Sequence, residues 1–125
     1  VMNEDKIKSK LFLDGLNAFN ASSFYDAHEY WEDLWSDYKL KDAKFIQALI
    51  QLSVGYFHIT NNNKNGANGL FKKCIPKFEL YKPKARGIDI NNILGCIHLS
   101  LLNLNDIDDL KKFNWSLVPK LEVKV

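Results

Sequence analysis

The stretch from Asp42 to Thr60 reads DAKFIQALIQLSVGYFHIT, and it decides the fold. Its apolar residues recur at helical spacing and cover nearly the whole circumference, which is typical of a helix at the centre of a helical domain. About nineteen residues at 1.5 Å each form a rod close to 30 Å long, about the width of a small domain. Its polar residues are therefore informative, and Gln47, Gln51 and His58 fall on one stripe.

Helical periodicity continues on the N-terminal side of this central stretch. We expect a first helix over residues 4–19, with Asn3 as its N-cap. A second helix should start at Ser22 or Ser23. Ser23 and Asp26 have the spacing of a capping box, with aspartate in place of the usual glutamate.

The C-terminal side is also predicted to be mainly helical. A fourth helix follows the loop 61–66 and contains Pro76, which should kink it because proline removes a backbone donor. A fifth helix is capped by Asp89, and a short sixth helix covers residues 106–113. The tail 115–125 contains a further proline and is expected to run extended and to pack its apolar residues on the bundle. No strand pair is expected.

These elements predict an all-α fold, a single-domain bundle of five or six helices that are mostly antiparallel neighbours. The domain should span residues 1–125, with its core roughly over 4–104 and a short helix and extended tail over 105–125. The composition agrees, because 46% hydrophobic and 26% charged residues in a 125-residue chain are typical of a globular domain. No apolar run approaches the ~18 residues that a membrane helix needs, so we expect no membrane partner.

Charge and cysteine content give coarser expectations. The formal net charge of +2 is too small to indicate nucleic-acid binding by itself. Cys74 and Cys96 have no metal-type spacing, and we expect both to be reduced thiols that pack as small hydrophobic residues. The polar stretch 1–10 lacks the apolar core of a signal peptide. We therefore expect a cytoplasmic or organelle-stromal location.

The densest run of chemistry-bearing side chains is HEYWEDLW, residues 28–35. His28 and Glu32 are four residues apart, so both reach one spot on a helix surface, where they would form an acid–base pair or share a metal. His58 would supply a third ligand, and Gln51 an outer hydrogen bond. Glu29 lies at the edge of the same run. Trp31 and Trp35 share the apolar stripe and are predicted to anchor the core.

Two interpretations of this polar cluster stay open. In the preferred one, the chain is a non-enzymatic module that binds a protein or a small ligand, and a buried cluster of His28, Glu32, Gln51 and His58 specifies how the second and third helices pack. In the alternative, the chain is a small metal-dependent or acid–base enzyme of hydrolase type. His28 and His58 then ligate a divalent metal, Glu32 ligates or acts as base, and Gln51 orients.

A basic cluster is a weaker candidate for a functional surface, and it comprises Lys72, Lys73, Lys77, Lys82, Lys84 and Arg86. Phe78 and Tyr81, which lie between these residues, could stack on bases. Both rings fall on the apolar face of the fourth helix, however, so we expect them to point inward and the lysines to form a solvated face. Nucleic acid is not the expected partner. Self-association through an apolar face stays open.

Two runs of sequence together resemble the uncharacterised family catalogued as domain of unknown function 309. The first is Phe19-Asn20 followed by FYDAHE-x-WE-x-x-W from Phe24, and the second is FIQALIQL from Phe45 followed by GY-x-H from Gly55. The similarity extends roughly from residue 11 to residue 104. It implies a compact all-α bundle but no activity, because the family has no agreed biochemical role. The residues that the resemblance singles out are His28, Glu29, Trp31, Glu32, Trp35, Gln51 and His58.

Overall fold

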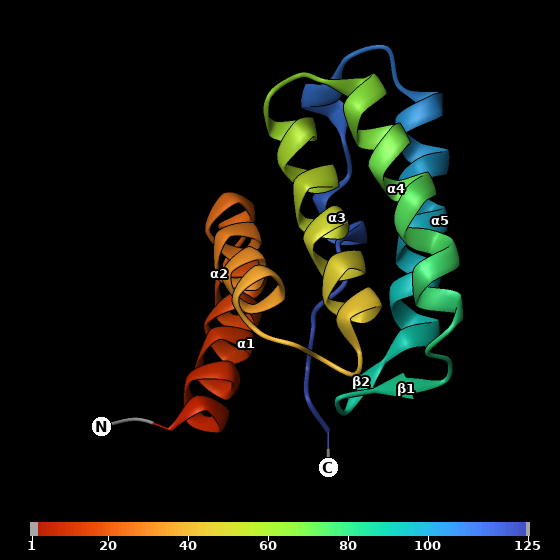
Figure 1. The fold of residues 1–125 in the computed structure, drawn as a ribbon. Helices are drawn as coiled ribbons and strands as arrows, with labels where there is room; N and C mark the ends of the chain where they lie inside the picture. The colour runs from red at the N-terminus through yellow and green to blue at the C-terminus, as the bar shows by residue number, and fades with distance from the viewer. Residues whose placement is uncertain (1–2, 125) are drawn as a thin grey trace.

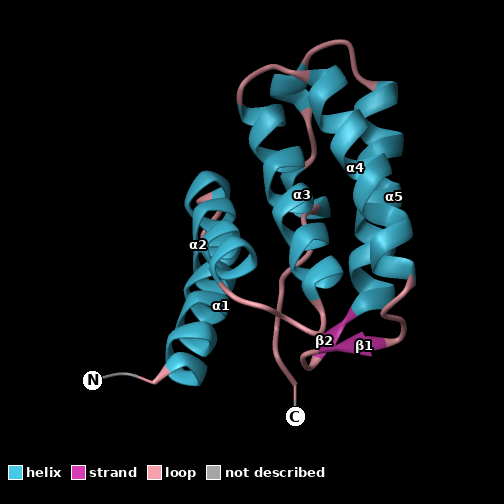
Figure 2. Ribbon diagram, viewed as in Figure 1, coloured by secondary structure: helices cyan, strands magenta, loops and turns pink. Residues whose placement is uncertain are grey.

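The computed structural model describes residues 3–124 and confirms the all-α bundle (Figures 1 and 2). The helices are α1 (Glu4–Asn20), α2 (Phe24–Asp37), α3 (Ala43–Thr60), α4 (Lys64–Glu79) and α5 (Ile90–Asp106). A hairpin of β1 (Lys84–Ala85) and β2 (Ile88–Asp89) precedes α5, and the 3₁₀ helices η1 (Leu110–Lys112) and η2 (Trp115–Leu117) follow it. The predicted domain ends at residues 1, 2 and 125 lie outside the described residues.

The helix α3 is the central element of the bundle, as its sequence predicts. It packs against α2 on one side and α4 on the other, while α1 pairs with α2 and α5 packs on α4 (Figure 1). Sequence neighbours are therefore neighbours in space, because short turns join long helices. Most of α3 is buried, and the strip left partly exposed contains Gln47, Gln51, Val54 and His58.

The packing of α1 on α2 depends on Trp31, whose side chain is fully buried. Its indole Nε1 donates a hydrogen bond to the Phe12 carbonyl at 3.2 Å. Gly15 lies directly against the indole ring, and a Cβ placed there would come within 2.1 Å of Nε1. Glycine at this position is what lets the two helices approach so closely.

A second buried contact joins α3 to α5. The hydroxyl groups of Tyr56 and Ser100 share a hydrogen bond at 2.8 Å, and both residues are fully buried. Desolvation in this environment raises the pKa of the Tyr56 phenol above its ordinary value. The bond satisfies two polar groups that would otherwise oppose folding.

Two of the three predicted helix caps are present. The Asn3 side chain accepts a hydrogen bond from the Lys6 amide at 2.9 Å, and Asp89 accepts one from the Asn92 amide at 3.0 Å. Ser23 precedes α2 as expected, but its hydroxyl makes no capping bond. Its ψ of 69° differs from the extended ψ of 166° at Asn3, so the predicted capping box does not form.

The segment between α4 and α5 corrects one prediction, because it contains a strand pair. Each strand has two residues, and the turn between them places Arg86 (φ 48°) and Gly87 (φ 78°) in the left-handed region. Two successive positive φ angles suit a tight hairpin turn. Upstream, α4 continues through Pro76 to its end.

The chain after α5 corrects a second prediction, because η1 and η2 replace the expected sixth helix. Beyond them, the tail returns across the bundle and buries Leu121. The Asn20 side chain bonds both backbone groups of Leu121, donating to its carbonyl at 2.9 Å and accepting from its amide at 2.8 Å. The Lys124 amide donates to the Gly87 carbonyl at 2.8 Å. The tail thereby ties the α1–α2 turn to the hairpin.

Candidate functional site

The helix α2 carries most of the predicted site residues, and its sequence determines which of them are covered. Phe24, Ala27, Trp31 and Leu34 are buried against α1 and α3. At 100° per residue, the positions of Tyr25, His28, Glu32 and Trp35 form the next stripe around the helix. The Tyr25 ring contacts Phe57 of α3 edge-on, with centroids 5.4 Å apart, so this stripe borders α3.

His28 and Glu32 lie together on this stripe, as their spacing predicts. The His28 Nε2 is 3.8 Å from the nearer Glu32 oxygen, and the two side chains are 27% and 48% exposed. The other imidazole nitrogen, Nδ1, lies 3.3 Å from the Tyr25 carbonyl. The Tyr25 ring covers the imidazole edge-on with centroids 5.3 Å apart. The pair is thus oriented by neighbouring groups while remaining accessible to water.

Gln51 interacts with α4 instead of α2. Its side-chain oxygen accepts a hydrogen bond from the Lys77 ammonium at 3.1 Å, and the same ammonium donates to the Lys73 carbonyl at 3.3 Å. Gln51 is half-buried between the two helices. Its contact therefore supports the packing of α3 on α4.

His58 takes part in the turn between α3 and α4. Its Nδ1 lies 3.3 Å from the side-chain nitrogen of Asn63. The oxygen of the same Asn63 side chain caps α4 by accepting a hydrogen bond from the Gly66 amide at 2.9 Å. This arrangement gives His58 a local structural role in positioning the cap.

The four residues His28, Glu32, Gln51 and His58 thus have three separate sets of partners, and the expected buried cluster is not confirmed. Glu29 and Glu32 are exposed, because α2 turns this edge away from the core. Over residues 3–124, no three histidine, cysteine, aspartate or glutamate side chains lie close enough together to hold a metal ion. The donor set proposed for a divalent metal therefore does not fit.

The two tryptophans predicted as core anchors occupy different environments. Trp31 is fully buried, whereas Trp35 remains 39% exposed. Four residues correspond to 400° of helix rotation, so Trp35 lies 40° further around α2 than Trp31. This offset moves the second ring from the core to the stripe that borders α3.

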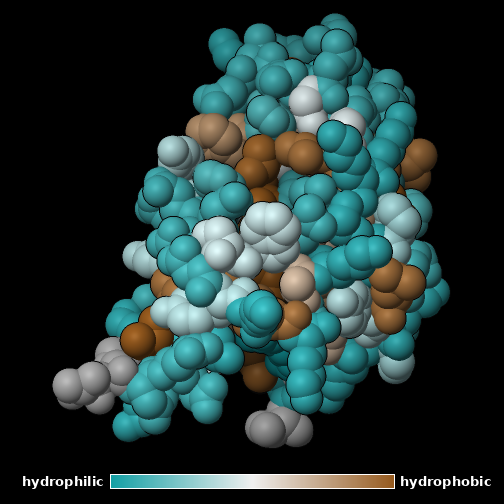
Figure 3. All heavy atoms as spheres, viewed as in Figure 1, coloured by the Kyte–Doolittle hydropathy of each residue, from teal (hydrophilic) through white to brown (hydrophobic). Residues whose placement is uncertain are grey.

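The stripe and the adjacent Glu29 form a surface that we call the α2 face: Tyr25, His28, Glu29, Glu32 and Trp35. Pale side chains of intermediate hydropathy and brown apolar side chains lie in the middle of the surface seen in Figure 3, over the region of α2 and α3. The helix contains five carboxylates and no lysine or arginine; the carboxylates are those of Asp26, Glu29, Glu32, Asp33 and Asp37. Partly exposed aromatic rings on a uniformly acidic helix are an unusual combination for a solvated surface.

The cysteines are poor candidates for chemistry. Burial raises the pKa of the Cys74 thiol to about 12, and partial burial also raises the pKa of Cys96. A thiol that resists ionisation is a weak nucleophile. Cys74 is fully buried and behaves as a small hydrophobic residue.

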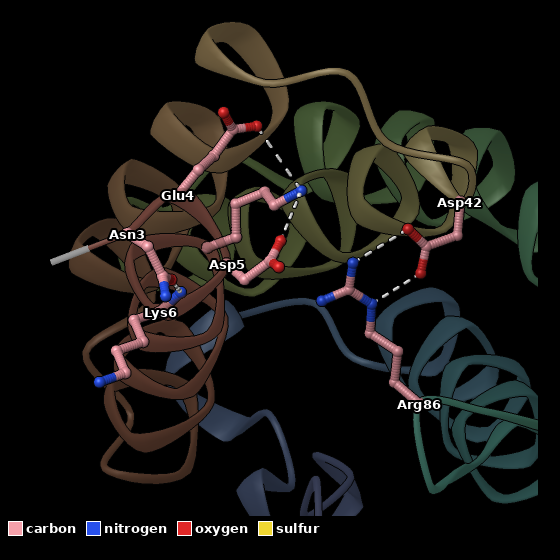
Figure 4. Close-up of polar contacts among 7 residues, drawn as sticks. Asn3, Glu4, Asp5, Lys6, Asp42 and Arg86 are labelled. Atoms are coloured by element: carbon pink, nitrogen blue, oxygen red, sulfur yellow. Dashed lines mark hydrogen bonds and ion pairs between the residues drawn. The ribbon is translucent and has the colours of Figure 1, made fainter.

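The basic cluster on α4 and the following loop is divided between solvent and structural contacts. Lys72, Lys73, Lys82 and Lys84 are exposed, while Phe78 is fully buried. Arg86 instead makes two hydrogen bonds to the Asp42 carboxylate, at 2.6 and 3.0 Å (Figure 4). Its guanidinium also stacks on the Phe12 ring, 4.6 Å from the centroid. Arg86 therefore links the hairpin to the start of α3.

A surface hollow of about 630 Å³ lies beside Arg86. It is lined by the start of α1 and by the α2–α3 connection. Lys8 in this hollow is held near Glu4 and Asp5 at 3.7 and 3.6 Å (Figure 4). Lys8 and Arg86 both have carboxylate partners. Lys39 and Lys41 also line the hollow, so its basic residues outnumber its acidic ones.

The fold and this surface define a helical-bundle protein, and no helix among the described residues has the length and apolarity to cross a bilayer. Residues 12–70 match the family described as domain of unknown function (DUF309), which confirms the resemblance seen in the sequence. The match spans α1 from Phe12, α2, α3 and the first part of α4, and therefore includes the whole α2 face. No curated protein matches the chain significantly.

Proposed function

We propose that this chain is a non-enzymatic interaction module that binds a basic segment of a protein partner on the α2 face. The observation that carries this proposal is that α2 contains five carboxylates and no basic residue, while the α2 face combines two of these carboxylates with two partly exposed rings. Tyr25 is 47% exposed and Trp35 is 39% exposed. Tyr25 is four residues from Glu29, and Trp35 is three residues from Glu32, so each ring has one carboxylate within about a helical turn.

The physical roles of the two residue types differ. Each exposed ion pair contributes only about 0.2–1 kcal/mol, so the carboxylates mainly steer a basic partner toward the surface. A guanidinium or ammonium over an aromatic face adds about 0.5–1 kcal/mol, and more when water is displaced. Trp35 supplies the largest such ring on the edge and is therefore expected to be the main source of affinity.

The enzymatic alternative is supported only by the contact between His28 and Glu32. Its metal-dependent form needs a third ligand, and His58 is engaged at the α3–α4 turn. An acid–base pair at 3.8 Å on an exposed helix edge also makes an electrostatic contact that needs no catalytic role. We therefore carry the binding proposal forward.

The test measures binding of a fluorescently labelled nona-arginine peptide by anisotropy at low and physiological salt. We expect Trp35→Ala to weaken binding about 5- to 30-fold, as loss of about 1–2 kcal/mol implies. The double variant Glu29→Gln/Glu32→Gln should weaken binding and flatten its salt dependence.

The matched control is Asp106→Asn/Glu122→Gln, which removes the same amount of charge from exposed positions outside α2. This control should bind the peptide almost as the original chain does. Equal weakening by both double variants would show a response to net charge alone and refute the α2 face as the binding site. Absence of binding by the original chain refutes the proposal directly. Circular dichroism of each variant checks that the bundle is intact.

A further inference from the structure

The outer surface of α5 carries no charged residue before Asp106, the last residue of the helix, unlike the outer surfaces of α1, α2 and α4. From Ile90 to Asn105 the sequence contains no aspartate, glutamate, lysine or arginine. Charged residues make up 26% of the whole chain, and an exposed helix normally places them on its outer side. The five carboxylates of α2 and the lysines of α4 follow that rule.

Five exposed residues of α5 form one continuous strip, the α5 face: Asn91, Gly95, His98, Leu99 and Leu102. Asn92, Asn105 and Asp106 are also exposed, and Asp106 lies at the C-terminal end of the helix, seven residues beyond Leu99. Leu99 is 52% exposed and Leu102 is 67% exposed. Gly95 is open, since a Cβ placed there would meet no atom within 4 Å. Two large aliphatic side chains therefore follow, within two helical turns, a position where another backbone can approach closely.

The position of α5 leaves this strip uncovered within the chain. The helix packs against α4 and contacts η2 and β1, and it forms the right-hand edge of the bundle in Figure 1. Its opposite side buries Ile93 and Ile97 completely. From Ile90 to Asn105 the inner and outer sides of α5 are thus both uncharged, which is the pattern of a helix covered on two sides.

We infer that the α5 face is a self-association surface on which a second copy of this chain packs α5 against α5 across a two-fold axis near Leu99. In a two-fold interface, each surface meets an identical surface, so any charged group near the axis meets its own like charge. The α5 face avoids that repulsion, whereas the acidic α2 face and the lysines of α4 would each incur it. Leucine side chains and the bare backbone at Gly95 can pack against their own copies, and asparagine side-chain amides both donate and accept hydrogen bonds.

The size of the surface indicates a weak and reversible dimer. The seventeen residues of α5 form a helix about 26 Å long. A single helix pair of this length covers less than the ~800 Å² per partner found in stable complexes. The dimer should therefore form and dissociate with protein concentration, and it does not depend on the function proposed for the α2 face.

Sedimentation velocity of the full chain over a concentration series tests this inference. The average mass should rise from 14.5 kDa toward twice that value. Leu99→Glu and Leu99→Lys should each raise the dimer dissociation constant at least about tenfold, because like charges then face each other. An equimolar mixture of these two variants should recover the dimer, since opposite charges now meet.

The control is Leu80→Glu, which introduces the same charge at a leucine that is 65% exposed at the end of α4. This variant should dimerise like the original chain. A chain that stays monomeric at all concentrations, or a dimer that survives both Leu99 variants, overturns the inference. A mixture of the Leu99 variants that remains monomeric overturns the two-fold arrangement, and equal loss in Leu80→Glu shows non-specific association.

Discussion

Replacing Gly15 with alanine should destabilise the protein, although the same change usually stabilises a helix. In a helix interior, alanine is more favourable than glycine by about 1 kcal/mol of helix-forming free energy. At Gly15, however, the added Cβ would lie 2.1 Å from the Trp31 Nε1, far inside van der Waals contact. Trp31 is fully buried and cannot swing into solvent. The indole must shift, and its hydrogen bond to the Phe12 carbonyl is lost.

The expected loss of stability in Gly15→Ala combines the cost of overpacking, the cost of the lost hydrogen bond and the gain in helix propensity. Overpacking costs about 1–3 kcal/mol, and a buried donor without a partner costs about 1–3 kcal/mol more. After the helix-propensity gain of about 1 kcal/mol is subtracted, the Gly15→Ala variant should lose about 1–5 kcal/mol of unfolding free energy. For a domain of this size, that loss lowers Tm by roughly 4–20 °C.

Urea denaturation followed by circular dichroism measures this change, and Gly69→Ala provides the control. Gly69 also lies inside a helix, but a Cβ there meets no atom within 4 Å. The control should therefore gain about 0.5–1 kcal/mol. If Gly15→Ala is as stable as the original chain, the close packing of α1 on α2 through Trp31 is refuted.

Other expected outcomes test burial and the attachment of the tail. In the native protein, a thiol reagent should modify Cys74 much more slowly than Cys96, since burial both shields Cys74 and raises its pKa to about 12; equal rates by mass spectrometry would contradict this. In the unfolded chain the Cys74 thiol loses its proton near pH 9.0, whereas in the folded protein its pKa is about 12. The free energy of unfolding should therefore fall as pH rises from 9.0 toward 12. A denaturant midpoint that stays constant over this pH range would argue against the burial of Cys74. Tyr56→Phe should cost about 1–2 kcal/mol in chemical denaturation, because its buried serine partner loses a hydrogen bond, and an unchanged stability would show that the bond contributes nothing. Asn20→Ala should release Leu121 and speed tryptic cleavage of the tail, and an unchanged cleavage rate would mean that other contacts hold it.

The central helix and its neighbours could be predicted because their sequence patterns are strong. Apolar residues cover nearly the whole circumference of α3, so this helix must lie at the centre of the bundle. The N-cap residues Asn3 and Asp89 indicate where two other helices begin. The hairpin before α5 was not predictable from such patterns. Its strands have two residues each, and Arg86 is an uncommon residue in a left-handed turn.

The site was predicted only in part, for a related reason. Periodicity along one helix correctly places His28 beside Glu32. The partners of Gln51 and His58 depend on how α4 packs, and helical spacing within α3 contains no information about that neighbour. The exposure of Trp35 could have been found from its 40° offset from Trp31, which places it at the edge of the buried stripe of α2.

The attachment of the tail to the α1–α2 turn has a consequence for synthesis on the ribosome. Asn20 and Leu121 are 101 positions apart. At about 5–20 residues per second, the chain needs roughly 5–20 s of translation between these two residues. During that interval the Asn20 amide is available to water and to other cellular proteins. The α1–α2 pair therefore forms before its contact with the tail exists, and this contact is made only after the chain has been synthesised as far as Leu121.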